Sequence, residues 1–393
     1  MPSMTTLDVA RVRDSFPSLG DGLARFDGPG GSLVPRQVAH AVAQAMAAGM
    51  CQRGSLTAPE RLTEETTAGA RAAVAGFVGG DPRGVVFGRS MTAIAFDLAR
   101  TLAQGWGPGD EVVVTRLDHD ANVRPWVVAA ERAGATVRWL GFDPDTAELD
   151  DVATVLSERT RLVALTGASN LFGTRPPVRE VADAAHAVGA LVHVDAVHLA
   201  AHAPVSLEAL GADLLTCSPY KFFGPHLGAL VAAPELLETL HPDKLLPSSD
   251  AVPERFELGT LPYEQLAGVS AAVAFIDEIG GMTAIEAHED ALLTRLLTGL
   301  DGLGHVRVHG SPVRRTPTVL LHVDGLAGED VRVALAERGV LAPAGSFYAI
   351  EASRHAGLGD AGGVRVGLSP YTDDGDVDRL LEGLAALAGA GAS

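Results

Sequence analysis

The chain has 393 residues, of which 47% are hydrophobic and 20% are charged. At roughly 150 residues per domain, this length predicts two or three structural units with an ample hydrophobic core. The formal net charge of −19 would repel a phosphate backbone, so we expect no nucleic-acid partner.

Cysteine usage and the N-terminal segment point to the cellular compartment. Cys51 and Cys217 are the two cysteines, too few for a disulfide framework or a Cys/His metal site, and we expect no bound metal. Asp8 and Asp14 stand where a signal peptide needs an apolar core, and no apolar run reaches the ~18 residues of a membrane span. We therefore expect a cytoplasmic protein without a membrane partner.

Short apolar runs alternate with helical patterns over the first two thirds of the chain. Helices are predicted at 35–48, 91–105, 122–134, 149–158 and 178–190, and strands at 84–88, 111–116, 136–142, 161–167, 191–198, 212–218 and 227–233. Because the strands are continuously apolar and separated by helices, they predict an α/β fold with a largely parallel sheet covered on both faces.

The pattern changes after residue 262. Helices are predicted at 263–280, 282–300, 328–339 and 374–387, and strands at 306–310, 316–324 and 363–368. This arrangement is typical of a smaller α+β unit. We therefore expect a large α/β domain over 28–262 and a small α+β domain formed by 1–27 and 263–393.

Lysine is almost absent from the chain, which makes each lysine informative. Of the 30 basic residues, 28 are arginines and only Lys221 and Lys244 are lysines. Lys244 lies in HPDKLL, where an exposed position explains it, but Lys221 lies in CSPYKFFGPHLGAL among aromatic residues, glycine and proline. Arginine cannot form an imine, whereas a desolvated lysine amine is a nucleophile. Lys221 is therefore the first candidate for catalysis.

Polar residues follow the other predicted strands, where ligands bind in such sheets. They are Ser90 and Thr92, which precede a helix, then His119, Asn170, Asp195 and His198. Ser90, Thr92 and the free N–H groups would form an anion site at a helix N-terminus, although an ordinary serine N-cap is the alternative. Asp195 taken alone would be read as a satisfied buried carboxylate.

The combination of these groups favours a cofactor. A phosphate site, a carboxylate, a flat aromatic ring and a buried amine are the groups that hold pyridoxal 5′-phosphate. The lysine forms a Schiff base with the cofactor, and the carboxylate keeps the ring nitrogen protonated so that the ring withdraws electrons. The glycines of GDGLARFDGPGG lack the preceding strand and following helix of a dinucleotide site.

Eight ordered sequence blocks resemble the class V aminotransferase superfamily of fold type I pyridoxal phosphate enzymes, and most closely its cysteine desulfurase-like family. The blocks are FDGPGG near 26, FGRSMTAIAF at 87–96, LDHDANVRPW at 117–126, ASNLFGT at 168–174, HVDAVH at 193–198, SPYKFFGPHLG at 218–228, FELGT at 256–260 and VRVGLSPYTDD at 364–374. The resemblance covers nearly the whole chain.

The resemblance implies a role for each matching residue. Lys221 carries the Schiff base, Asp195 pairs with the ring nitrogen, His119 lies over the ring, and His198 stands where the family usually has a glutamine bound to the ring's 3-oxygen. Thr92, Ser218 and Tyr220 fall at phosphate-binding positions, and Thr260 reaches the phosphate from a partner subunit. Ser90 and Met91 are also expected to bind the cofactor. Asn170 and Arg365 match positions that hold the carboxylate of a small amino acid substrate, a task that suits a guanidinium fork. The family is homodimeric with shared active sites.

The sequence departs from the desulfurases at one chemical step. These enzymes carry a mobile cysteine that takes sulfur from the substrate, and its place here falls around Ser346–Tyr348, where there is none. Cys217 is expected to be buried packing, whereas Cys51 remains a possible substitute nucleophile. A carbon–sulfur lyase or desulfurase acting on cysteine or a derivative ranks first.

Three other functions stay open. Transamination and epimerisation start from the same removal of the Cα proton by the freed lysine amine. A regulatory or scaffold protein that binds the cofactor is the non-enzymatic alternative. Lys221, Asp195 and Arg365 together argue against it, because a scaffold needs no electron sink.

Overall fold

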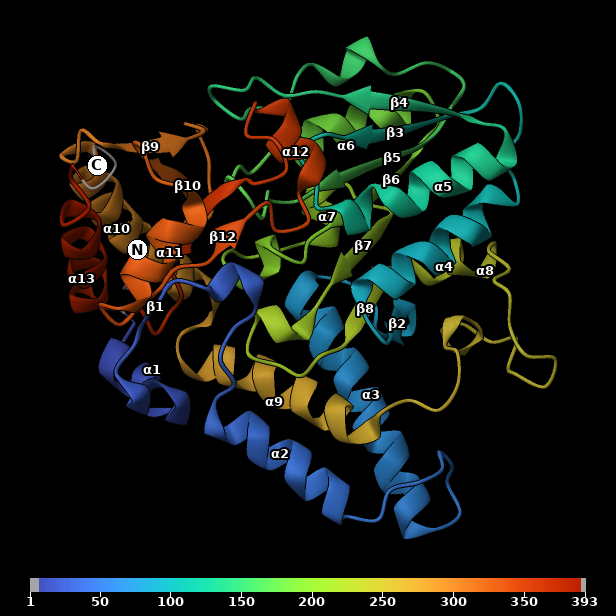
Figure 1. Ribbon diagram of the computed structural model, residues 1–393. Coiled ribbons are helices and arrows are strands. Elements are labelled where there is room, and N and C mark those ends of the chain that lie inside the picture. Colours follow the sequence, from blue (N-terminus) through green and yellow to red (C-terminus); the bar gives the residue numbers. More distant parts are fainter. Residues whose placement is uncertain (1–6, 390–393) are drawn as a thin grey trace, which may run out of the picture.

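A seven-stranded sheet forms the centre of the larger part of the molecule (Figure 1), and the computed structural model describes residues 7–389. Its strands are β2 (Val85–Gly88), β3 (Glu111–Thr115), β4 (Thr136–Leu140), β5 (Thr160–Thr166), β6 (Leu191–Asp195), β7 (Leu214–Cys217) and β8 (Gly228–Ala232). They lie in the order β2-β8-β7-β6-β5-β3-β4. β8 runs opposite to the other six strands of this sheet, so the prediction of a largely parallel sheet is confirmed.

Helices cover both faces of this sheet. Along β3, Val112 and Val114 belong to one hydrophobic cluster and Val113 belongs to another. The first cluster contains residues of α4 (Met91–Ala103), α5 (Arg124–Ala133) and α8 (Pro234–Glu238), and the second contains residues of α1 (Val9–Asp14), α3 (Ala58–Val78), α6 (Val178–Ala187) and α9 (Tyr263–Glu278). This two-sided burial explains why the strands are continuously apolar.

A second, antiparallel sheet of four strands lies beside the first (Figure 1). It consists of β9 (Val306–His309), β10 (Thr318–Val323), β12 (Ala344–Gly345) and β13 (Gly363–Gly367). Three helices pack with it, α10 (Gly281–Asp301), α11 (Gly328–Ala336) and α13 (Asp374–Ala385). Ala24 and Phe26 share this second core, and β1 (Ala24–Arg25) pairs with β11 (Val340–Leu341). The exact division of the chain into two domains stays a prediction.

Two predictions about helices need correction. The helix predicted at 149–158 is wrong, because this segment holds only the 3₁₀ turn Val152–Thr154. The Asp151 side chain accepts a hydrogen bond from the Ala153 N–H group at 2.9 Å, and such local bonds compete with a helix. The 21-residue helix α3 was missed, although its Thr57–Glu60 capping box is a recognisable start signal.

The remaining helices connect the layers. They are α2 (Arg36–Ala47), α7 (Leu207–Leu210) and α12 (Ile350–His355). Helix α9 packs against α2 and α3, as Figure 1 shows below the sheet. Within residues 7–389 no single helix is long and apolar enough to cross a membrane; α9 and α10 meet that test only as a pair, with a 66° bend between them.

Candidate active site

The carboxyl ends of β2, β3, β5, β6 and β7 meet at one edge of the large sheet, where a cavity of about 680 Å³ opens. Eleven of the twelve predicted site residues line it. They are Ser90, Met91, Thr92, His119, Asn170, Asp195, His198, Ser218, Tyr220, Lys221 and Arg365. The structure thus brings together residues that are spread over 276 positions of the sequence.

Thr260 is the predicted residue that does not line this cavity. It is exposed and lines a separate cavity of about 470 Å³ together with Arg89 and His226. Its assignment to the site of a partner subunit stays a prediction.

Lys221 ends the short turn Pro219–Lys221 that follows β7. The buried residues Phe222 and Phe223 come directly after it, and its Nζ donates a hydrogen bond to the Pro29 carbonyl. Burial lowers the pKa of the amine to about 7, with a further contribution from the Arg365 charge, and Asp195 opposes both. A large fraction of the amine is therefore neutral near pH 7, as a nucleophile requires.

Asp195 is the last residue of β6, paired in register with Thr166 of β5 and Thr216 of β7. Burial raises the pKa of its carboxyl to about 6, while a hydrogen bond from Val197 and the charge of Lys221 work in the opposite direction. The Val197 N–H group donates to Oδ1 at 2.9 Å. A desolvated carboxylate gains most from a cationic partner, so this position suits a protonated ring nitrogen.

Ser90, Met91 and Thr92 begin α4. The Ser90 side chain accepts a hydrogen bond from the Ala93 N–H group at 3.1 Å, so the alternative of an N-cap is confirmed. The cap leaves other N–H groups of the first turn without an intrahelical acceptor, and they remain available to an anion. Gly228 lets β8 approach closely, because a Cβ atom there would lie 2.3 Å from the Met91 nitrogen.

His119 lies on the turn after β3. Its Nδ1 accepts a hydrogen bond from the Ala121 N–H group at 3.0 Å. Burial lowers its pKa to about 4, and the charges of Lys221 and Arg365 contribute. The imidazole is therefore neutral at pH 7, with its proton on Nε2, and offers a flat uncharged face to a bound ring.

Arg365 enters the cavity from β13 of the second sheet. Its Nη1 donates to the Asn170 carbonyl at 3.0 Å, and the guanidinium carbon lies 3.8 Å from the centre of the Phe347 ring. Asn170 in turn donates from Nδ2 to the Phe347 carbonyl at 3.0 Å. Burial lowers the pKa of Arg365 to about 9. A desolvated guanidinium held on two sides is preorganised for a carboxylate.

His198 is buried and lies three residues after Asp195, in the turn that follows β6. Its Nε2 lies 3.0 Å from the Oγ1 atoms of both Thr316 and Thr318. Its Nδ1 is buried without a hydrogen-bond partner. Burial holds its pKa well below the usual value, so the ring is neutral.

The segment 346–348, where the family resemblance places the desulfurases' cysteine, lies at the cavity. Phe347 and Tyr348 line the cavity, and both adopt positive φ angles, 52° and 60°, which non-glycine residues rarely do. The Tyr348 carbonyl accepts a hydrogen bond from the Asp120 N–H group at 2.7 Å. Neither cysteine lines the cavity.

The two thiols differ in environment. Cys217 is buried, as predicted, and burial raises its pKa to about 12, so it is not a thiolate at pH 7. Cys51 is exposed in the connection between α2 and α3.

A buried polar network behind His119 was missed. Asp118 accepts hydrogen bonds from the Thr115 hydroxyl and from Asn122 Nδ2 at 2.7 Å. The Asn122 Oδ1 lies 2.8 Å from His193 Nδ1. Burial raises the pKa of Asp118 to about 8. The dense polar run LDHDAN after the buried strand β3 was the available signal.

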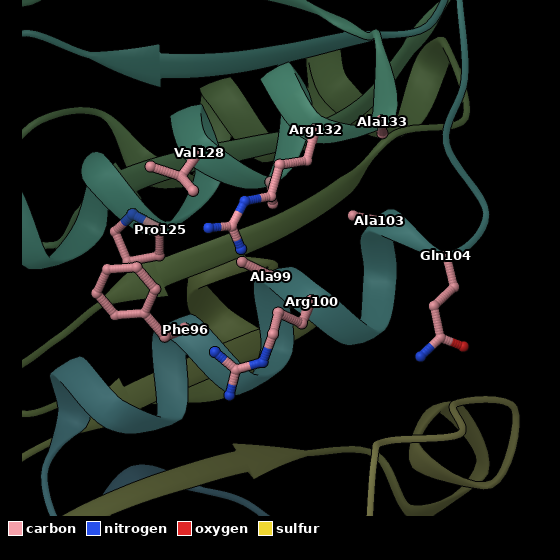
Figure 2. A pocket seen from close by; sticks show the side chains of 10 residues that line it. Phe96, Ala99, Arg100, Ala103, Gln104, Pro125, Val128, Arg132 and Ala133 are labelled. Carbon is pink, nitrogen blue, oxygen red and sulfur yellow. The ribbon is translucent and has the colours of Figure 1, made fainter.

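A smaller cavity of about 240 Å³ lies between α4 and α5 (Figure 2). Figure 2 shows the Arg100 and Arg132 side chains in its middle, with Phe96 and Pro125 at one end. Phe96 lines both cavities. The smaller cavity has no nucleophile or carboxylate among its lining residues. The cavity of about 680 Å³ at the strand ends is therefore the candidate active site.

The larger cavity has the chemistry that pyridoxal phosphate needs. The desolvated Lys221 amine, the Asp195 carboxylate, the neutral His119 ring and the N-terminus of α4 could hold its aldehyde carbon, ring nitrogen, ring face and phosphate. Within residues 7–389 no group of three or more histidine, cysteine or acidic side chains could hold a metal ion.

A mostly parallel sheet with a buried lysine and a carboxylate at neighbouring strand ends defines an α/β fold of the fold type I class. The chain belongs to the aminotransferase class-V family, whose model matches residues 25–380.

Relatives and solved structures agree with this assignment. The chain is 33% identical over 410 residues to the probable cysteine desulfurase 2 of Mycobacterium leprae, covering 97% of both chains. It is 34% identical over 397 residues to an uncharacterized protein of Mycobacterium tuberculosis, covering 97% of this chain and 99% of that one. The structure of the cysteine desulfurase CsdA of Escherichia coli superposes with a TM-score of 0.88 at 26% identity, over 98% of this chain and 100% of that one. The predicted family is therefore confirmed.

Proposed function

We propose that this protein is a pyridoxal phosphate-dependent enzyme that acts on a small amino acid and breaks the Cβ–S bond of cysteine or a cysteine derivative. One observation carries the proposal: the desolvated amine of Lys221 shares one cavity with the carboxylate of Asp195 and the guanidinium of Arg365. The relatives named cysteine desulfurase favour sulfur chemistry.

Different residues of the cavity would bind different parts of the cofactor. Bound pyridoxal phosphate supplies an electron sink for the negative charge left when a proton leaves Cα. Asp195 would keep the ring nitrogen protonated, and the neutral His119 ring would offer it a flat face. Ser218, Tyr220 and the first turn of α4 would bind the phosphate.

The chain's own residues then act on the substrate. Arg365 and Asn170 hold the α-carboxylate, which orients the Cα–H bond. Lys221 Nζ takes the Cα proton, and the electron pair of the Cα–H bond forms a Cα=Cβ double bond as the Cβ–S bond breaks. The sulfur keeps the electron pair of the broken bond and leaves as a thiolate or hydrosulfide. The released enamine takes up a proton at carbon to become an imine, which one water molecule hydrolyses to a keto acid and ammonia.

The absence of a thiol from the cavity lining supports elimination over persulfide transfer. Persulfide transfer needs a thiolate that reaches the substrate sulfur. Phe347 and Tyr348 occupy the corresponding wall. We therefore infer that sulfur leaves without a protein-bound persulfide.

Transamination is the second candidate. Its support is a relative described as an aminotransferase-like protein of Gibberella zeae, 30% identical over 420 residues and 97% of this chain. Transamination uses the same lysine, carboxylate and arginine and requires no thiol.

Product analysis tests these alternatives. The purified protein is incubated with L-cysteine, L-cystine and S-alkyl cysteines, and pyruvate, ammonia, sulfide or thiol, and alanine are measured. Elimination predicts equal amounts of pyruvate and ammonia and no alanine. Alanine together with a protein persulfide contradicts elimination, and a sulfur-containing keto acid that forms only with an amino acceptor favours transamination.

We also infer a homodimer with shared active sites. The inference rests on the matching position of Thr260 and on its exposed place outside the chain's own cavity. Sedimentation at assay concentration should show a dimer. A fully active monomer contradicts the inference.

A further inference from the structure

Glu289 is a buried acid that the proposed reaction does not use. It lies on α10 with 0% of its surface exposed and does not line the cavity. Its Oε2 lies 2.9 Å from His202 Nδ1, and its Oε1 is buried without a partner. Burial raises its pKa to about 7, and His202 opposes this shift. Burial of a carboxyl with a single partner costs folding free energy, which suggests that Glu289 has a function.

His202 connects Glu289 to the cavity. It lies four positions after His198, and the two rings meet edge to face with their centres 4.7 Å apart. On its other side the His198 Nε2 lies between Thr316 and Thr318. The ring of His198 is therefore held between two threonine hydroxyls and the His202–Glu289 pair.

The threonines and the His202–Glu289 pair act differently on His198. A neutral imidazole has one donor and one acceptor nitrogen, and its hydrogen bonds decide which is which. The Thr316 hydroxyl donates to the Gly173 carbonyl at 3.2 Å, so its oxygen accepts from His198 Nε2–H and fixes the tautomer. The contact with His202 lies on the ring itself, so it acts on the orientation of the ring.

We propose that Glu289 and His202 are positioning residues that hold the ring of His198 in one orientation at the cavity. The proposal rests on the proposed function for the identity of the cofactor. The arrangement of the three side chains does not depend on it.

Glu289→Gln tests the pair while keeping its size. The matched control is Glu286→Gln, which removes a charge one turn away on α10, where Glu286 pairs with Arg175 and makes no hydrogen bond with His202. The first measurement is nitrogen-15 NMR of histidine-labelled protein as isolated. Wild type and Glu286→Gln should show the same single set of His198 ring signals, and Glu289→Gln should show shifted or split signals, because the ring takes more than one orientation. An unchanged His198 signal in Glu289→Gln overturns the proposal, even if that variant melts at a lower temperature.

The second measurement is the release rate of cofactor from the loaded protein into excess competitor. Glu289→Gln should accelerate release about tenfold, the size of one hydrogen bond, and Glu286→Gln should not. In a His198→Gln background the Glu289→Gln effect should vanish, because the glutamine lacks the ring that His202 contacts. Equal acceleration in both backgrounds overturns the proposal. If the wild-type protein carries no cofactor, the proposed function fails, and the NMR comparison still decides the positioning role.

Discussion

The wall of the cavity formed by the strand ends of the large sheet differs from the wall formed by the segment 345–349 and β13. In the first wall, Asp195 ends β6, Lys221 follows the neighbouring strand β7, and Asp195 pairs in register with Thr216 of β7. In the second, Phe347 and Tyr348 adopt positive φ angles and are tied to the first wall by hydrogen bonds to Asn170 and Asp120.

This difference suggests that the two walls have different functions. The strand ends carry the groups proposed to hold the cofactor. The opposite wall carries Arg365, which is proposed to bind the substrate carboxylate, and the segment where the family resemblance places the desulfurases' cysteine. We infer that residues of the first wall bind the cofactor and that residues of the second wall determine which reaction follows. Substitutions in each wall test this inference separately.

The largest effect is expected at the first wall from Lys221→Ala. Removal of the amine deletes both the covalent attachment and the base, so turnover should fall on the order of 10⁴-fold. The matched control is Lys244→Ala, because Lys244 is the other lysine and pairs with Asp250 outside the cavity. Steady-state kinetics decide; equal losses in the two variants would remove Lys221 from the mechanism.

Asp195→Ala removes a second group from the same wall and should lower turnover without loss of the cofactor. The variant should still bind the cofactor through Lys221 but lose roughly 10³-fold in turnover, because the ring nitrogen loses its charged partner. Absorption spectra check cofactor loading and assays check turnover. Near wild-type turnover would show that Asp195 does not face the ring nitrogen.

Arg365→Lys changes the proposed carboxylate-binding group of the second wall. A lysine keeps the charge but cannot form the two parallel hydrogen bonds to a carboxylate, so KM should rise about 10- to 100-fold. Arg100→Lys, in the separate smaller cavity, should leave KM unchanged. An unaltered KM in Arg365→Lys would mean that the carboxylate binds elsewhere.

A thiol can be placed in the second wall by Tyr348→Cys. Tyr348 lines the cavity and Ser346 does not, so Ser346→Cys is the matched control. Tyr348→Cys should produce alanine and a protein persulfide from L-cysteine, in amounts several-fold above the control. Mass spectrometry of the intact protein detects the persulfide. Persulfide in neither variant would argue that more than a thiol separates the two reactions.

The smallest effect is expected from Cys51→Ser. Cys51 is exposed and does not line the cavity, so the variant should keep activity within about twofold, as surface substitutions usually do. Loss of activity together with loss of alanine formation would make Cys51 a substitute nucleophile and would overturn elimination.

The sequence predicted the first wall better than the second. Strand ends of a parallel sheet meet at one edge, so Asp195 and Lys221 could be placed together from periodicity alone. Arg365 lies on another sheet, and only the family resemblance connected it to the cavity. Local signals were misread where side chains compete with the backbone, as at Asp151, and the partners His202 and Glu289 are 87 positions apart, which no local pattern links.

Reduction of the purified protein with borohydride, followed by peptide mapping, tests the central claim most directly. The account predicts a yellow protein whose reduced cofactor adduct is found on Lys221, because this amine is desolvated and has a pKa lowered to about 7. An adduct on Lys244, or no adduct at all, would contradict it.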